Sequence, residues 1–139
     1  MKKKIILSLI ALLTVTVLIT GCSLLDGMFQ TNIDGTWIGS NKATGKCTEY
    51  TVKMVISGNT VKWYDATAAY KAAVLMWSEG DDEPTAAWES EPAYTGTVSV
   101  SDNTITFSFL GVNTTGTLAK DKKSFTYKVG THTDTFKKQ

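Results

Sequence analysis

The stretch YTGTVSVSDNTITFSF, residues 94–109, decides the fold class of this chain. Its apolar residues fall on alternate positions, in one run that includes Val98 and a second run that begins at Ile105, with Ser and Thr between them. Strict alternation of this kind is typical of a β-strand that buries one face. Because the polar turn Ser-Asp-Asn separates the two runs, the stretch predicts an antiparallel hairpin.

The same pattern continues on both sides of this hairpin. Further alternating segments are residues 47–57, 61–64, 115–119, 124–129 and 131–137, and turn residues separate them. Short strands with closely spaced turns indicate an all-β barrel or sandwich. Adjacent hairpins favour an up-and-down antiparallel β-barrel of about eight strands, because closure removes exposed strand edges.

Residues 47–57 give the alternation most fully. One predicted face carries Tyr50, Val52, Met54 and Ile56, and the other carries Glu49, Thr51 and Lys53. The first set is apolar and the second polar, so we expect the first to face the barrel interior. The next strand continues this arrangement, with Val61 and Trp63 on its inner face.

Residues 65–77 interrupt the alternation and are rich in alanine. Tyr70, Val74 and Trp77 follow one another at helical spacing, which favours a short helix inserted between strands. Asp65 is the expected N-cap of this helix. The consecutive apolar residues that begin at Val74 also fit a buried strand, so a helix or an irregular insertion stays open.

The N-terminus has the pattern of a secretory signal. Lys2, Lys3 and Lys4 precede an uncharged, mostly apolar run over residues 5–20. A basic start, an apolar run and small residues at its end are typical of a cleaved signal peptide. The alternative is an uncleaved anchor, but the run is short for a membrane span. We expect a signal-peptide helix over residues 1–21, a lipidated tether over 22–32 and the β-barrel domain over 33–139.

The residues Ile19-Thr20-Gly21-Cys22 resemble a bacterial lipobox. The resemblance implies that Cys22 carries diacylglycerol with acyl chains such as palmitate and becomes the first mature residue. Two or more acyl chains hold a protein stably at a bilayer. The resemblance therefore implies a lipoprotein anchored in the cell envelope. Ser23 after the cysteine favours the outer membrane where the organism has two membranes.

Gly35-Thr36-Trp37 at the start of the first strand resembles the Gly-x-Trp signature of lipocalin-like proteins. Together with the strand pattern, the resemblance implies a lipocalin-like barrel whose base is closed by Trp37. It also implies a small hydrophobic ligand, such as a lipid or fatty acid. Lipocalins pack a late arginine over this tryptophan, whereas all 14 basic residues here are lysines. Lys128 and Lys137 are the candidates to stand in for it.

Aromatic residues gather around the segment that interrupts the strands. The candidate ligand-binding residues among them are Trp63, Tyr70, Trp77, Trp88 and Tyr94. Such rings can line an apolar pocket that has a few polar groups. The alternative is that they fill and cap the core without contacting a ligand.

Composition excludes several other classes. The formal net charge is +1 and no basic stripe is present, which argues against a nucleic-acid partner. With Cys22 lipidated, Cys47 has no intrachain disulfide partner and is expected to be a small buried residue. The acidic loop over residues 79–91 lacks the spacing of a calcium-binding loop, so we expect no metal.

Catalytic signals are sparse. His132 and Asp134 lie two positions apart and would share one strand face, so that a contact between them is feasible. No nucleophile, metal-binding or phosphate-binding motif accompanies them. The sequence therefore predicts no enzyme and no cofactor. It leaves three alternatives: a small-ligand binder, a protein-binding lipoprotein of the lysozyme- or protease-inhibitor type, and an accessory envelope lipoprotein without a ligand.

Overall fold

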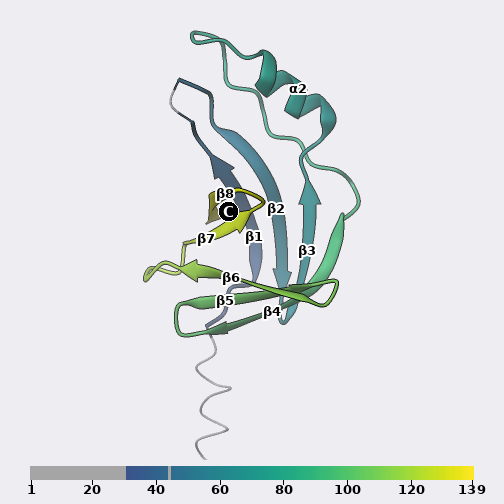
Figure 1. Ribbon diagram of the computed structural model, residues 1–139, viewed down its shortest axis with the longest axis vertical. Coiled ribbons are helices and arrows are strands. Elements are labelled where there is room, and N and C mark those ends of the chain that lie inside the picture. The colour runs from purple at the N-terminus through teal and green to yellow at the C-terminus, as the bar shows by residue number, and fades with distance from the viewer. Residues whose placement is uncertain (1–30, 44) are drawn as a thin grey trace, which may run out of the picture. The chain divides into compact units, whose positions relative to one another are not determined.

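Eight strands form a closed antiparallel barrel in the computed structural model, which describes residues 31–43 and 45–139 (Figure 1). The strands are β1 (Gly35–Asn41), β2 (Glu49–Ser57), β3 (Thr60–Asp65), β4 (Tyr94–Ser101), β5 (Thr104–Phe109), β6 (Val112–Leu118), β7 (Ser124–Val129) and β8 (His132–Lys138). Each strand pairs with the next, and β8 pairs with β1. The predicted up-and-down barrel is confirmed. The predicted signal peptide and Cys22 lie outside the described residues.

Apolar side chains fill the barrel interior. The buried core consists of Ile33, Trp37, Val52, Met54, Ile56, Val61, Val98, Ile105, Phe107, Leu118, Phe125, Tyr127 and Phe136. The rings of Phe125 and Phe136 stack with their centroids 4.8 Å apart. An eight-stranded barrel is just wide enough for its own side chains or one small ligand. In this barrel the side chains occupy that space.

Trp37 is fully buried near the start of β1, where its ring packs on Phe125 at a centroid distance of 5.0 Å. Its indole Nε1 donates a hydrogen bond to the Ile33 carbonyl at 2.8 Å. Lys138 places its Nζ 5.7 Å from the indole centroid. The expectation that Lys128 or Lys137 would take this place is wrong, because Lys138 is the residue that pairs with Trp37 across β1 and β8.

The seam between β1 and β8 depends on a close approach at Gly39. Gly39 pairs with Phe136, and a Cβ atom on residue 39 would lie 2.6 Å from the Phe136 ring. Contacts that short do not occur between real side chains, so only glycine leaves room for the ring. The absence of a side chain in β1 thus makes space for a large one in β8.

The inserted helix α2 (Ala68–Met76) lies between β3 and β4, as the helical spacing predicts. Its N-cap is Thr67, whose hydroxyl accepts a hydrogen bond from the Tyr70 backbone N–H at 3.3 Å. The expectation that Asp65 caps the helix is wrong. Asp65 still belongs to β3, where it pairs with Val52 and accepts from the Trp63 indole.

The antiparallel order gives the barrel two distinct ends. The base contains Ile33, where the described chain enters β1, and the turn at Gly58 between β2 and β3. The mouth contains the connection from β1 to β2, the whole segment from Ala66 to Ala93 with α2, and the turns before β6 and β8. Figure 1 shows α2 beyond the ends of β1, β2 and β3, on the side away from the base.

Candidate functional site

A β-bulge in β2 builds the polar side of the mouth. Gly39 pairs with Val52, yet the next residue of β1, Ser40, pairs with Tyr50 and skips Thr51. An extra residue in one strand reverses the alternation of side chains beyond it. Thr51 consequently faces the mouth with Glu49, and Tyr50 faces an outer groove. The expectation that Tyr50 shares the inner face with Val52 is wrong for this reason.

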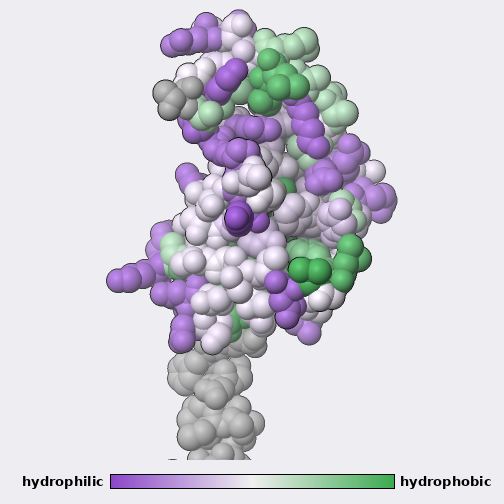
Figure 2. Space-filling view, in the orientation of Figure 1, coloured by the Kyte–Doolittle hydropathy of each residue, from purple (hydrophilic) through white to green (hydrophobic). Residues whose placement is uncertain are grey.

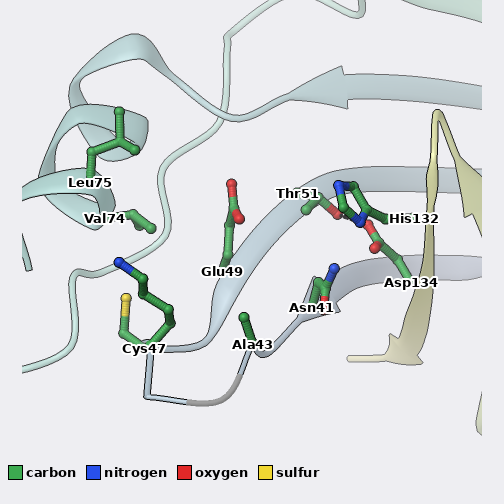
Figure 3. A pocket seen from close by; sticks show the side chains of 10 residues that line it. Asn41, Ala43, Cys47, Glu49, Thr51, Val74, Leu75, His132 and Asp134 are labelled. Carbon is green, nitrogen blue, oxygen red and sulfur yellow. Dashed lines mark hydrogen bonds between the residues drawn. The ribbon is translucent and has the colours of Figure 1, made fainter.

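The mouth holds a pocket with a volume of about 410 Å³ (Figure 3). Its polar lining comes from Asn41, Lys46, Glu49, Thr51, His132 and Asp134, and its apolar lining from Ala43, Cys47, Val74 and Leu75. Figure 3 shows the carboxylates of Glu49 and Asp134 on strands and Val74 across from them on α2. Volumes of this size suit small-molecule sites.

Asp134 is the one polar residue among the fully buried side chains of the described chain, with 1% of its surface exposed. Its carboxylate Oδ2 accepts a hydrogen bond from the Thr51 hydroxyl. Its Oδ1 is buried and has no hydrogen-bond partner among the described residues. An unsatisfied buried acceptor costs roughly 1–3 kcal/mol, so such an atom in a native protein requires an explanation.

His132 lies two residues before Asp134 on β8, and both line the mouth pocket (Figure 3). The predicted shared face of this pair is confirmed. The carboxylate is turned to Thr51, however, and His132 is exposed at the rim. The arrangement therefore offers hydrogen-bonding groups at two depths: a buried carboxylate and an accessible imidazole above it.

Tyr70 fixes α2 over the mouth. Its hydroxyl accepts a hydrogen bond from the Tyr50 backbone N–H at 2.9 Å and donates to the Thr48 carbonyl at 3.5 Å. Burial raises the pKa of the Tyr70 hydroxyl above its ordinary value, and the bond from Tyr50 opposes this in part. Tyr70 is thus an anchor between helix and strand, and the helix in turn sets the apolar wall that includes Val74.

The predicted aromatic candidates occupy several different places. Trp63 and Tyr94 do come together, with ring centroids 6.4 Å apart, and Trp63 also meets Phe109 edge-on at 5.7 Å. The Trp63 indole donates to Asp65 Oδ1 at 2.9 Å. Trp63 and Phe109 pack against the core, and none of these three rings lines the mouth pocket. Tyr70, as described above, holds α2.

Trp77 and Trp88 lie in the segment after α2. The Trp77 indole donates a hydrogen bond to the Asp81 carbonyl at 3.1 Å, and this bond closes a turn just after the helix. Trp88 forms a β-bridge through Ala66 and lines the outer groove, with a volume of about 770 Å³, where Tyr50 also lies. None of the five aromatic candidates lines the mouth pocket, and Trp88 lines the outer groove.

The acidic segment after α2 folds back on the barrel. Glu83 contacts Lys42 at 4.0 Å and accepts a hydrogen bond from the Thr48 backbone N–H at 3.4 Å. Within residues 31–43 and 45–139, no group of three or more His, Cys, Asp or Glu side chains is arranged to hold a metal ion. Cys47 is buried and free, and it contributes to the pocket wall.

The mouth pocket thus sets a polar strand side against an apolar helix side. Such a site can hold a small molecule that has a polar head and an apolar body. Sequence reasoning identified His132 and Asp134 through their spacing but missed Thr51 and Glu49, because the bulge that turns them has no sequence signature. It also missed Asn41 at the end of β1. Comparison with known proteins finds no family model, no curated protein and no solved structure that matches the chain.

Proposed function

We propose that this chain is an exported lipoprotein, anchored through acyl chains on Cys22, whose lipocalin-like barrel binds a small molecule at its mouth. The observation that carries the proposal is the mouth pocket of about 410 Å³, which has Asp134 on its polar side and Val74 on its apolar side. In this role the domain captures a ligand outside the cell membrane and does no chemistry on it.

The filled interior supports the mouth as the site. Trp37, Phe107 and Phe125 are each less than 2% exposed and occupy the barrel below the mouth. A ligand deep among these rings would require them to move, and close-packed interiors resist such movement. The ligand is therefore held at the open end, and it is amphipathic rather than wholly apolar.

The direction of β1 supports the anchored arrangement. The chain enters the barrel at the base, and β1 then runs for seven residues to the mouth, roughly 20 Å at about 3.3 Å per residue. A tether that enters at the base leaves the mouth free for ligands. No helix in the described part of the chain has the length and apolar character to cross a membrane.

Two variants test the ligand part of this proposal. Ala43→Trp places a large ring at an exposed position that lines the pocket, and Ala68→Trp makes the same change at an exposed helix position away from it. After gentle extraction, native mass spectrometry should find a small molecule on the wild-type lipoprotein and on Ala68→Trp. It should be absent from Ala43→Trp. A bound molecule that is unaffected by Ala43→Trp would place the site elsewhere.

The anchor has its own test. Cys22→Ser should leave the precursor uncleaved and without fatty acid, because the thioether that precedes cleavage cannot form. Intact mass measurement of the wild type and the variant checks this. Fatty acid on the serine variant at the wild-type level would refute the assignment of Cys22.

A second candidate function, binding of a protein partner, is favoured by the apolar rim. In the described part of the chain, the exposed large apolar side chains all belong to elements or turns at the mouth end: Leu75, Met76, Tyr94, Leu110 and Val112. Figure 2 shows the apolar patch over α2, where Leu75 is 84% and Met76 76% exposed. Exposed apolar patches of this kind often mark interaction sites.

A further inference from the structure

The unpaired oxygen of Asp134 indicates the chemistry of the ligand. Thr51 satisfies Oδ2 only, and Oδ1 is buried in the pocket wall with no partner among the described residues. A carboxylate oxygen is an acceptor, so the group that completes it must be a donor. We propose that the mouth pocket binds a small organic cation, with its ammonium group against Asp134; this rests on the proposed small-molecule function of the mouth.

The charges that line the pocket favour a cation over an anion. Glu49 adds a second carboxylate to that of Asp134, and Asn41 and Thr51 offer neutral oxygens. Lys46 is the one lysine among the described lining residues, and its exposed position lets its ammonium group stay in water. Hydrogen bonds from a cation to a carboxylate are stronger than neutral ones, which suits an ammonium head.

The surroundings of the mouth add to this preference. The segment from Trp77 to Ala93 contains Glu79, Asp81, Asp82, Glu83, Glu89 and Glu91 and no basic residue. Lys42, which contacts Glu83, lies at the same end with Lys46 and Lys71, and these three lysines offset only part of this charge. Acidic groups around an opening raise the local concentration of cations and speed their entry. The mouth is therefore electrostatically suited to a positively charged ligand.

The apolar wall indicates an organic body behind the charge. Val74 of α2 faces the strand side of the pocket, and Leu75, Ala43 and Cys47 also contribute carbon atoms to its lining. A metal ion would gain nothing from these carbon atoms, and the described residues contain no cluster that could ligate one. A primary amine with a compact hydrocarbon body fits both sides of the pocket at once.

Three probes of the same shape test the charge preference. Cyclohexylmethylamine, cyclohexylmethanol and cyclohexanecarboxylate differ in the charge of the head group and share the same ring. Each is titrated calorimetrically into the detergent-extracted lipoprotein, with empty micelles as the blank. We expect the amine to bind about tenfold more tightly than the alcohol. The carboxylate should bind most weakly, and added salt should weaken the amine alone.

Matched variants assign the preference to Asp134. Asp134→Asn removes the charge with little change of shape, and Asp102→Asn makes the same change in the exposed turn between β4 and β5 at the base. Asp134→Asn should abolish the tenfold advantage of the amine, whereas Asp102→Asn should keep it. Should Asp134→Asn fail to fold, Glu49→Gln at the exposed start of β2 serves instead and should weaken the amine severalfold.

The outcomes separate this inference from the function on which it rests. If the amine and the alcohol bind equally and Ala43→Trp abolishes both, the preference for a cation is refuted. The mouth then still stands as a ligand site. An advantage of the amine that survives Asp134→Asn and Glu49→Gln would overturn the role of these carboxylates. Failure of all three probes to bind would count against both proposals.

Discussion

Thr51 and Asp134 are joined by a hydrogen bond from the Thr51 hydroxyl to the carboxylate, across 83 positions of sequence. The bond ties the bulge of β2 to β8 at the mouth. Thr51→Val should leave both carboxylate oxygens without a partner and lower the free energy of unfolding by about 1–3 kcal/mol. Thr51→Ser keeps the hydroxyl and should lie close to the wild type. Urea unfolding measures both, and equal stability of the two variants would contradict the role of the bond.

The close approach of Gly39 and Phe136 gives a second prediction. Gly39→Ala would put a Cβ atom 2.6 Å from the Phe136 ring, and overpacking of this kind typically costs about 1–3 kcal/mol. Phe136→Leu alone should also destabilise, through the loss of ring contacts with Phe125. The double variant should be more stable than the sum of the two losses implies, because the smaller side chain admits the methyl group. Strictly additive losses would show that the two residues do not compete for space.

The anchor at Tyr70 predicts a sensitivity to alkali. Because burial raises the pKa of this hydroxyl above 10.0 in the folded state, the neutral form is favoured by folding. The corresponding stability is fully present below about pH 10 and is lost as the pH rises through the higher folded value. A phenolate absorbance titration of the wild type should contain one late component that Tyr70→Phe lacks. Tyr94→Phe, a change at an exposed ring, should retain it.

Tyr70→Phe also removes the acceptor of the Tyr50 backbone N–H, so we expect a loss of about 1 kcal/mol at neutral pH. The difference in stability between the wild type and this variant should shrink as the pH is raised. A difference that stays constant into strong alkali would mean that the hydroxyl does not titrate with folding.

The apolar rim makes the protein-binding alternative testable. Leu75 and Met76 are exposed, so Leu75→Glu and Met76→Glu should change the stability by no more than about 0.5 kcal/mol. If the rim binds a protein, a photocrosslinking residue at position 76 should give a covalent adduct with a defined partner in cells. The same residue at position 102, in the turn at the base, should give none. The absence of an adduct at position 76 would refute the protein-binding candidate and would not affect the small-molecule proposal.

Much of the fold could be predicted because its causes are local. Alternation along 94–109 places Val98, Ile105 and Phe107 in the core, where the structure has them. The helical spacing that begins at Tyr70 marks α2 correctly, although the N-cap lies two residues later than expected, at Thr67. A run of hairpins favours closure of the barrel, because closure pairs the two edge strands that an open sheet would leave exposed.

The site was harder to predict because its causes are not local. The bulge at Thr51 arises from how β1 and β2 pair. The residues around Thr51 give no sign that it lacks a partner in β1. Proximity in sequence also says little about which of the aromatic residues meet. Trp63 meets Tyr94 through the pairing of β3 with β4, whereas Trp77 bonds to a carbonyl only four residues away.

The pairing of β1 with β8 also affects how the protein folds. Residues 37–40 find their second neighbours only in residues 135–138, so the ring closes between nearly the most distant parts of the domain. Contacts of such long range carry a high entropic cost and slow folding. If the chain leaves a channel with its N-terminus first, the sheet stays open with two unpaired edge strands until its last strand is available. Its first strand depends on its last, and until β8 arrives the nascent protein is open to proteases and to joining with other chains.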